Sequence, residues 1–196
     1  MTKAERTRQL IIEKTAPLFN KKGFDGTSLS DLTESTGLTK GALYGNFNDK
    51  EEIALEAFKY SIKKVKETAR QKVDAEQTYK KQLFALIDFY AEYVFNPPIP
   101  GGCPMLNMAV EADDYRTPMR KVVTKELMDT ITFITSLLEG GIKAGEFKKD
   151  TKSNEIAYTI FCSVEGALMF ARVERSDEPM KIIVRHCKNL VNQISK

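Results

Sequence analysis

Apolar residues recur at helical spacing along most of the chain. Between residues 4 and 22, one helical face carries Ile11, Thr15, Leu18 and Phe19, which predicts an amphipathic helix. Gly23 follows and favours the end of that helix. The sequence has no Asn-Gly hairpin turn and no sustained alternation of apolar and polar residues, two patterns that would indicate strands. We therefore predict an all-α fold.

Two short helices joined by a tight turn are predicted over residues 27–47. Thr27 or Ser28 stands where the first of them begins, and Thr39 stands where the second begins. Hydroxyl side chains of this kind cap helix N-termini. Gly37 lies in the turn between the two helices, where helix-turn-helix units commonly have a glycine. The sequence therefore predicts a helix-turn-helix unit, with the helix over residues 4–22 as its third member.

The second of these short helices has an outward surface that is polar, small and free of carboxylates. Its inward residues are Ala42, Leu43 and Phe47, and its outward residues are Lys40, Gly41, Tyr44, Gly45 and Asn46. A helix that lies against phosphates needs such a surface, because an exposed acid would be repelled. From this local pattern alone, an ordinary helical hairpin that binds protein stays open as an alternative.

The remaining chain predicts a longer helical region. A helix from about Asp49 to Val73 begins after Asn48, which can cap it, and its apolar residues thin out after Val65. Further helices are expected over 79–95, 105–112 and 117–144, with a break at NPPIPGGCP, residues 96–104. We expect residues 1–50 to form the helix-turn-helix domain, 51–76 a linking helix and 77–196 a C-terminal domain.

The last two helices carry apolar stripes with alternating three- and four-residue steps. This is the spacing of helices that pack at about 20° in a bundle. Because both helices lie at the end of the sequence, the stripes can serve a subunit interface as readily as a core, and we expect a homodimer. The stripe residues are Ala157, Ile160, Val164, Ala167, Ala171, Met180, Ile183, Cys187, Leu190 and Ile194.

Composition narrows the class of protein. Apolar residues make up 42% and charged residues 29% of the 196 residues, as in an ordinary globular protein. No apolar run approaches the roughly 20 residues that span a bilayer, and the first residues lack the apolar region of a signal peptide. We expect a cytoplasmic protein without a membrane partner.

Motifs for catalysis or cofactor binding are also missing from the sequence. There is no nucleophile elbow, P-loop or HExxH motif. Three cysteines without a CxxC pair and a single histidine, His186, argue against a structural zinc site or a disulfide framework. We expect no cofactor, no metal and no enzyme activity.

Positive charge gathers at the start of the chain. The net charge is only +3, yet residues 1–24 hold six Lys or Arg against two Glu. A basic segment ahead of a helix-turn-helix is the electrostatic footprint expected of a nucleic-acid-binding protein.

Residues 23–53, GFDGTSLSDLTESTGLTKGALYGNFNDKEEI, resemble the DNA-binding domain of TetR/AcrR-family regulators. The matching features are a Gly-aromatic pair, Thr-Ser, the series Gly-Leu-Thr-Lys-Gly-x-Leu-Tyr-x-x-Phe, and Lys-Glu, all in fixed register. The resemblance implies a three-helix DNA-binding domain followed by a helical ligand-binding and dimerisation domain. It also implies a repressor that binds a pseudo-palindromic operator in double-stranded DNA and leaves it when a small-molecule effector binds.

The resemblance also implies roles for single residues. Thr27 and Ser28 would anchor phosphates at a helix N-terminus, and Thr39, Lys40 and Gly41 would enter the major groove. Tyr44 and Lys50 would contact phosphates, and Asn46 a phosphate or a base. At Gly45-Asn46 this sequence departs from the family, which commonly has an aromatic or polar residue followed by His, so base readout at this point is not implied.

A pocket for the effector is expected among side chains with polar tips on otherwise apolar helices. Asn107 and Glu111 stand four residues apart and also have the option of bonding each other. The candidates are Tyr90, Tyr93, Asn107, Glu111, Tyr158 and Glu165, with walls from Met108, Met128 and Phe161.

Cys103 carries a separate hypothesis. The segment GGCPMLNMAVEADD is similar to a Gly-Cys-x-x-x-Asn-x-x-x-Glu arrangement in some TetR-like sensor domains, a few of which sense oxidants or electrophiles. A helix N-terminus lowers the pKa of a thiol, so Cys103 is a candidate redox or electrophile sensor, the alternative being a small residue at a helix start. Cys162 and Cys187 fall within the apolar stripes and are expected to be inert.

Overall fold

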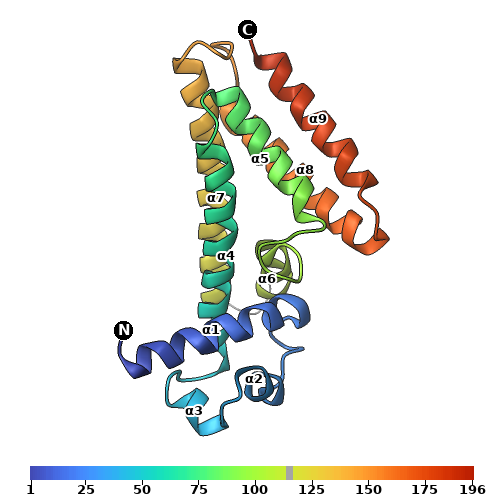
Figure 1. Ribbon diagram of the computed structural model, residues 1–196. Coiled ribbons are helices and arrows are strands. Elements are labelled where there is room, and N and C mark those ends of the chain that lie inside the picture. The colour runs from blue at the N-terminus through green and yellow to red at the C-terminus, as the bar shows by residue number, and fades with distance from the viewer. Residues whose placement is uncertain (114–116) are drawn as a thin grey trace. The chain divides into compact units, whose positions relative to one another are not determined.

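The computed structural model describes residues 1–113 and 117–196. Within these ranges it is helical and contains no strand, which confirms the predicted all-α class. The helices, labelled in Figure 1, are α1 (Lys3–Lys22), α2 (Leu29–Thr36), α3 (Lys40–Tyr44), α4 (Lys50–Asp74), α5 (Tyr79–Tyr93), α6 (Pro104–Ala112), α7 (Thr117–Lys143), α8 (Ser153–Glu174) and α9 (Glu178–Ile194).

The chain divides into two compact units. Unit 1 contains residues 1–65 and 98–123, and unit 2 contains residues 66–97 and 124–196. This division differs from the predicted domains, because the segment 98–112 groups with the N-terminal helices instead of with the C-terminal domain. Polar contacts between that segment and the end of α1, described below, account for the difference.

Unit 1 is built on a small apolar core beneath the helix-turn-helix. The side chains of Ile11, Leu32, Leu43 and Ile53, one from each of the first four helices, have no solvent exposure. α1 continues through Pro17 to Lys22, and Gly23 ends it with a positive φ of 74°. The predicted hydrophobic face of the first helix is confirmed as its packed face, because Ile11, Thr15 and Phe19 are buried.

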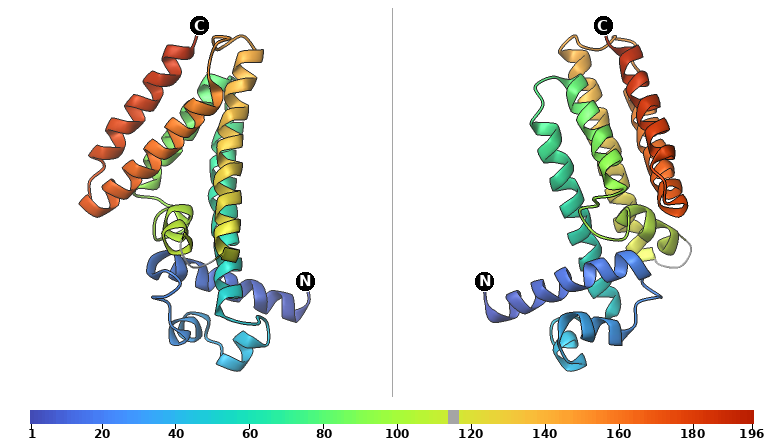
Figure 2. Two further views of the ribbon diagram at one scale, coloured as in Figure 1. Left: turned by 180° about the vertical axis from the view of Figure 1, so that it is seen from behind. Right: turned by 45° about the vertical axis from the view of Figure 1, so that its right-hand side comes forward.

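Unit 2 contains a bundle of α5, α8 and α9, which contact one another pairwise and run side by side in both views of Figure 2. The apolar stripes of α8 and α9 form its core within a single protomer. Seven of the residues predicted for a subunit interface are buried here, and Ile183, Leu190 and Ile194 are half-buried. The buried seven are Ala157, Ile160, Val164, Ala167, Ala171, Met180 and Cys187.

The assignment of these seven residues to a subunit interface was therefore wrong, since their side chains are already covered by their own chain. Periodicity identified the packed face of each helix correctly, but it does not say whose atoms cover that face. By length and hydropathy alone α8 would suffice to span a membrane. Eight of its residues are buried in the bundle, however, which is the pattern of a core helix.

Two glycines near the end of α7 permit close packing. A Cβ atom on Gly141 would lie 2.2 Å from the ring of Phe147, and one on Gly140 would lie 2.3 Å from the ring of Tyr79. Both rings belong to the same unit, and Phe147 is fully buried. The glycines therefore weaken the helix locally but leave room for two aromatic side chains.

Replacing Gly141 with Ala is expected to lower the free energy of unfolding by about 1–3 kcal/mol, the usual cost of overpacking. This loss should outweigh the roughly 1 kcal/mol that alanine contributes through helix propensity. Gly41→Ala is the matched control, because its Cβ would meet nothing nearer than Thr39 Oγ1 at 4.0 Å, and it should raise stability. Urea unfolding followed by circular dichroism measures both. A Gly141→Ala protein as stable as the parent would contradict the packing argument.

Candidate DNA-binding site

The turn between α2 and α3 is fixed by capping interactions. Ser28 Oγ accepts a hydrogen bond from the backbone N–H of Asp31 at 3.1 Å, and the Asp31 carboxylate accepts one from the N–H of Ser28 at 2.8 Å. Gly37 ends α2 in the left-handed region with φ of 69°. Thr39 Oγ1 accepts from the N–H of Ala42 at 3.2 Å and so caps α3. Ser28 is thus the cap of the first short helix, and the predicted cap at Thr39 is confirmed.

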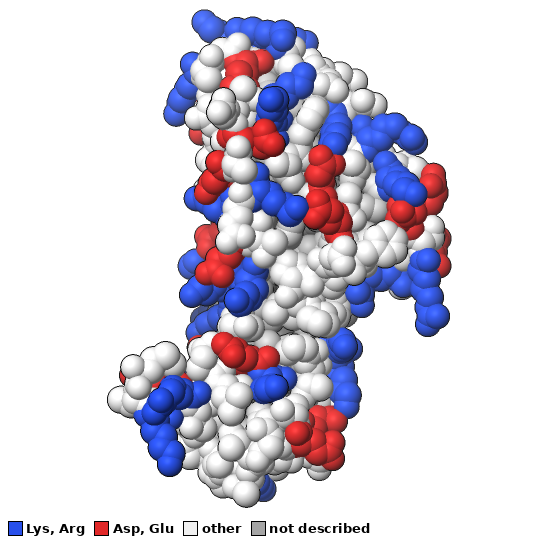
Figure 3. All heavy atoms as spheres, in the orientation of Figure 1, with Lys and Arg blue, Asp and Glu red and all other residues white. Residues whose placement is uncertain are grey.

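α3 presents a short polar surface above a buried anchor. Leu43 has no exposure and Phe47 only 3%, so they hold the helix to unit 1, whereas Tyr44 is 38% exposed. Thr39, Lys40, Gly41 and Gly45 are also exposed. In the view of Figure 3, the surface at α3 is largely free of charged side chains, and basic side chains lie along α1. The outward residues predicted for α3 are therefore exposed together, apart from the half-buried Asn46, and none of them is a carboxylate.

Arg8 of α1 fixes the end of this surface, a role that the sequence reasoning missed. Its guanidinium donates to the backbone carbonyl of Asn46 at 2.5 Å and to Glu52 Oε1 at 2.7 Å, and it stacks 4.0 Å above the ring of Phe47. In the sequence, Arg8 stood out only as one part of a basic segment. Because one planar guanidinium satisfies three neighbours at once, Arg8 ties α1 to the segment that joins α3 to α4.

The start of α4 is capped differently from the prediction. Asp49 Oδ1, not the side chain of Asn48, accepts from the N–H of Glu52 at 2.8 Å. Asn48 instead donates to Glu52 through its backbone and side-chain N–H groups at 2.8 and 2.9 Å. These bonds, led by the one from the Asn48 backbone and followed by the one from Arg8, lower the pKa of the Glu52 carboxyl.

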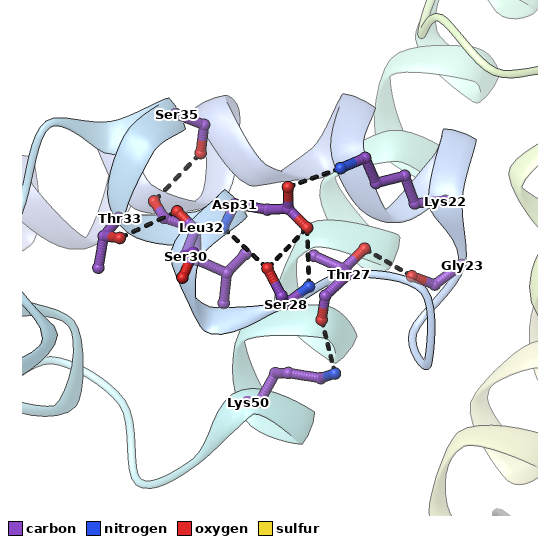
Figure 4. A network of polar contacts seen from close by, with 10 residues as sticks. All are labelled: Lys22, Gly23, Thr27, Ser28, Ser30, Asp31, Leu32, Thr33, Ser35 and Lys50. Carbon is purple, nitrogen blue, oxygen red and sulfur yellow. Dashed lines mark hydrogen bonds and ion pairs between the residues drawn. The ribbon is translucent and has the colours of Figure 1, made fainter.

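Thr27 and Lys50, two of the predicted phosphate anchors, are both engaged within the protein in this structure (Figure 4). Thr27 is fully buried and its hydroxyl donates to the carbonyl of Gly23 at 2.6 Å. Lys50 Nζ donates to the carbonyl of Thr27 at 2.7 Å and lies 4.2 Å above the ring of Phe24. A phosphate contact by the Thr27 side chain was therefore a wrong expectation, because its hydroxyl is enclosed and already used. Ser28 is exposed.

Asn46, two residues after the end of α3, is turned back onto that helix. The side chain is half-buried, and its Nδ2 donates to the carbonyl of Ala42 at 2.9 Å. The amide NH₂ predicted to reach a phosphate or a base is thus engaged within α3. The outward positions that keep their polar groups at the surface are Thr39, Lys40 and Tyr44.

Asp31 is held in its charged form. Lys22 Nζ lies 2.6 Å from Asp31 Oδ1, and the hydrogen bond from Lys22, followed by those from Ser28, lowers the pKa of the Asp31 carboxyl to about 2. The contacts appear together in Figure 4, where Lys22 at the end of α1 reaches across to the start of α2. A carboxylate in the first turn of α2 also interacts favourably with the helix dipole.

Two of the predicted effector contacts belong to unit 1 and bind α1 instead. Asn107 Nδ2 donates to the carbonyl of Asn20 at 2.8 Å and to that of Gly101 at 3.0 Å. The Glu111 carboxylate accepts from the backbone N–H of Phe24 at 2.7 Å. The option that Asn107 and Glu111 bond each other is therefore wrong, since each is directed to the end of α1.

Asn20 completes this arrangement, which we call the α1–α6 clasp: Asn20, Phe24, Gly101, Gly102, Asn107 and Glu111. Asn20 is 8% exposed and its Nδ2 donates to the carbonyl of Gly102 at 2.9 Å. Gly101 has φ of 122°, and a Cβ there would lie 2.7 Å from the Asn20 carbonyl oxygen. Gly101 is thus required for the loop to approach α1 closely, and Gly102 also has a positive φ, of 96°.

The other effector candidates divide between the units. Met108 and Cys103 are buried in unit 1, with Cys103 only 3% exposed. In unit 2, Tyr90, Tyr93 and Phe161 are buried, with the rings of Tyr90 and Phe161 6.4 Å apart, and Glu165 is half-buried. Tyr158 and Met128 are exposed and contact each other, Oη to Sδ, at 3.5 Å. Tyr158 and Met128 thus lie at the surface, apart from the buried aromatic residues of α5 and α8, and their effector contacts stay a prediction.

The remaining cysteines differ from each other. Burial raises the pKa of the Cys187 thiol to about 11, in agreement with an inert role. Cys162 is exposed instead of lying in the buried stripe as predicted. In the part of the chain that the structure describes, no group of three or more His, Cys, Asp or Glu side chains is placed to hold a metal ion.

Arg8→Met is expected to lower the free energy of unfolding by about 1–2 kcal/mol, because two hydrogen bonds from a charged donor are lost at a partly exposed site. Arg6→Met is the matched control, since Arg6 is exposed on the same helix. Hydrogen exchange at the amides of residues 46–52 should accelerate in Arg8→Met only. Equal effects of the two substitutions would show that Arg8 does not fix this segment.

The Asp31 carboxyl is expected to titrate with a midpoint near pH 2 in a carboxyl-detected NMR experiment. Because this pKa lies below the ordinary value of 3.8, the carboxylate stabilises the fold above about pH 4, and that contribution is lost as the pH falls towards 2. Lys22→Gln should move the midpoint upwards, whereas Lys21→Gln should not. An unchanged midpoint in Lys22→Gln would contradict the assigned cause.

Comparisons with known proteins agree with this geometry. The family model described as "Bacterial regulatory proteins, tetR family" matches residues 11–57, and "Tetracyclin repressor-like, C-terminal domain" matches residues 80–187. A TetR-family transcriptional regulator from Cytophaga hutchinsonii superposes with a TM-score of 0.94 at 39% identity, covering 100% of this chain and 98% of that one.

Two more distant proteins are similar to this chain, one in sequence and one in structure. The Bacillus subtilis HTH-type transcriptional regulator YxaF is 27% identical over 98% of this chain and 99% of its own. The TetR-family regulator CifR, solved as a cysteine mutant in complex with operator DNA, has a TM-score of 0.80 at 19% identity, covering 92% of this chain and 94% of its own. The match of both family models and of a relative at 39% identity establishes that this chain is a helix-turn-helix transcriptional regulator of the TetR family.

Proposed function

We propose that this regulator is a cytoplasmic homodimeric repressor that reads a pseudo-palindromic operator through α3 and dissociates when a small molecule binds. The observation that carries the proposal is the exposed, carboxylate-free surface of α3, which capping residues and Arg8 hold in a fixed position. A major groove admits one α-helix, and a short helix with small and polar outward residues fits against base edges and phosphates.

The proposed DNA contacts depend on which polar groups lie at the surface and which are already hydrogen-bonded within the protein. Thr39, Lys40 and Gly41 at the start of α3 would enter the groove, and the Tyr44 hydroxyl would donate to a phosphate. Ser28 would contact a phosphate at the start of α2. Lys50 and Asn46 would join only by exchanging their internal partners, the Thr27 and Ala42 carbonyls, for DNA oxygens. Thr27 would contribute no side-chain contact.

A homodimer is supported by apolar side chains on the outer surfaces of α8 and α9. Val173 is 81% exposed, Phe170 55%, and Met169 and Ile182 46% each. Gly166 lies on the same side of α8 as Met169 and Val173, and a Cβ atom there would meet nothing within 4 Å. Exposed apolar side chains that recur on one side of a helix favour a protein–protein contact. Two copies joined here would present two α3 helices to two half-sites.

Release by an effector requires a ligand that prefers a conformation unable to bind DNA. Tyr90, Tyr93, Phe161 and Glu165 of α5 and α8 form the proposed ligand-contacting group, since aromatic walls with one acid suit a small organic molecule. The α1–α6 clasp supports a route to the DNA-binding helices. Any shift of α6 and the loop before it must carry the end of α1 along or break four buried or half-buried hydrogen bonds between them.

Thiol sensing through Cys103 is not part of the proposal. Cys103 as a whole is only 3% exposed at the start of α6, and a redox-sensing cysteine needs access to its oxidant. Burial supports the alternative of a small residue at a helix start, next to the glycines that approach α1.

Binding to duplex DNA from upstream of the protein's own gene tests the proposal. Fluorescence anisotropy at several salt concentrations should give saturable binding in the nanomolar range that resists competitor DNA and weakens steeply with salt. Tyr44→Phe, which removes only the hydroxyl, and Lys40→Gln should each weaken binding about tenfold or more, and Lys40→Gln should reduce the salt slope by about 1. Lys149→Gln, the loss of an exposed charge in unit 2, is the control.

Weak binding to every duplex, equal in the parent and both α3 variants, would contradict operator reading through α3. That outcome would favour the alternative in which the helix-turn-helix contacts a protein. Binding that is lost in Lys149→Gln as much as in Lys40→Gln would point to general charge attraction instead of groove recognition.

A further inference from the structure

A groove of about 510 Å³ lies between α5 and α9, away from every residue assigned to DNA or effector above. The two helices contact each other in unit 2 and run side by side in Figures 1 and 2. Small-molecule sites have volumes of roughly 300–1,000 Å³, so the groove is large enough for one. Its lining residues are Phe84, Ala91, Phe95, Asp177, Met180, Lys181, Val184, Arg185, Lys188, Asn189 and Asn192.

The groove has an apolar base. Met180 is buried, Ala91 and Val184 are half-buried, and the ring of Phe84 lies beside them. Phe95, just after the end of α5, is 65% exposed. Phe95 is thus an exposed aromatic side chain at the edge of the groove. An apolar ligand that covered its ring would bury apolar surface, which favours binding.

Among the residues that line the groove, the basic side chains outnumber the acidic ones. Lys181 pairs with Asp177 at 2.8 Å, and Lys188 pairs with Asp88 at 2.6 Å while lying 5.4 Å from the ring centre of Phe84. Arg185 is exposed and, among the described residues, forms no ion pair. The lining therefore holds three cations and a single carboxylate, Asp177, with the guanidinium of Arg185 available.

We propose that this groove binds a medium-chain fatty carboxylate, with its alkyl chain on the apolar base and its carboxylate on Arg185. A guanidinium presents paired N–H donors that match the two oxygens of a carboxylate. The amides of Asn189 and Asn192, which line the same wall of α9, supply further polar contacts. One available cation matches one negative charge, and the apolar base provides a surface for an alkyl chain.

The proposal is independent of the operator and effector assignments. The effector residues proposed above lie on α5 and α8, and none of them lines the groove. The outward apolar residue of α9, Ile182, is also absent from its lining. A ligand here would contact α5 and α9 together, so it would add to the stability of the bundle by binding only the folded state.

Isothermal titration calorimetry with decanoate, below its micellar concentration, tests the proposal on the full-length protein. We expect saturable binding of one decanoate per protomer and at least about tenfold weaker binding of decanol, which has the chain without the charge. Arg185→Gln should weaken decanoate binding about tenfold or more and leave decanol unchanged. Lys149→Gln is the matched control for the loss of a positive charge and should bind decanoate as the parent does.

Ala91→Phe provides a second variant that keeps every charge but fills the groove, and it should weaken both ligands. Circular dichroism of each variant checks that the helices are retained. Decanoate binding that is equal in the parent, Arg185→Gln and Ala91→Phe would overturn the proposal and place the ligand elsewhere. Absence of decanoate binding, with a change of oligomeric state in Arg185→Gln, would overturn it in favour of a protein partner or a second copy on this surface.

Discussion

The hydrogen bonds at the C-terminal end of α1 determine which segments make up the DNA-binding unit. Asn20 and the N–H of Phe24 are polar groups in a largely apolar setting, and the loop before α6 and α6 itself satisfy them. A buried polar group that loses its partner costs roughly 1–3 kcal/mol. The segment 98–112 is therefore bound to the N-terminal helices, although it follows α5 in sequence.

α1 also fixes the positions of α2 and of the segment that follows α3, through one basic residue near each of its ends. Near its start, Arg8 binds the carbonyl of Asn46 and the carboxylate of Glu52, and at its end Lys22 binds Asp31 in α2. One helix thus connects the α1–α6 clasp to both members of the helix-turn-helix. A rigid element with two ends is a physical means of coupling α6 to α3, provided that α6 has a second arrangement available.

The local structure was predictable because its causes are local. Ser28, Gly37 and Thr39 act within three or four residues of themselves through capping and the left-handed backbone, so their roles can be read from sequence. The periodicity of α8 and α9 likewise identified the packed faces. The identity of the covering atoms depends on long-range packing. For that reason Ala157 and Cys187 were predicted to meet a partner subunit, although their own protomer buries them.

The polar contacts of the site were harder to predict. Arg8 and Glu52 lie 44 residues apart, and Glu111 and Phe24 lie 87 apart, so no spacing rule relates them. Asn107 and Glu111 were recognised as polar residues on one face of an apolar helix, but the sequence did not show that this face meets α1. The hydroxyl of Thr27 was expected to contact phosphate because of its residue type and its place before α2. Residue type does not show whether a loop residue is exposed, and Thr27 is buried.

The proposed function depends on two copies of α3 reading two half-sites of one operator. Selection from random duplex DNA by the purified protein, followed by sequencing, tests this directly and requires no assumption about the operator sequence. We expect enrichment of an inverted repeat whose half-site centres are separated by about one helical turn, roughly 10 base pairs, or a multiple of it. Recovery of unrelated sequences, or of a single unrepeated site, would contradict paired reading by two α3 helices.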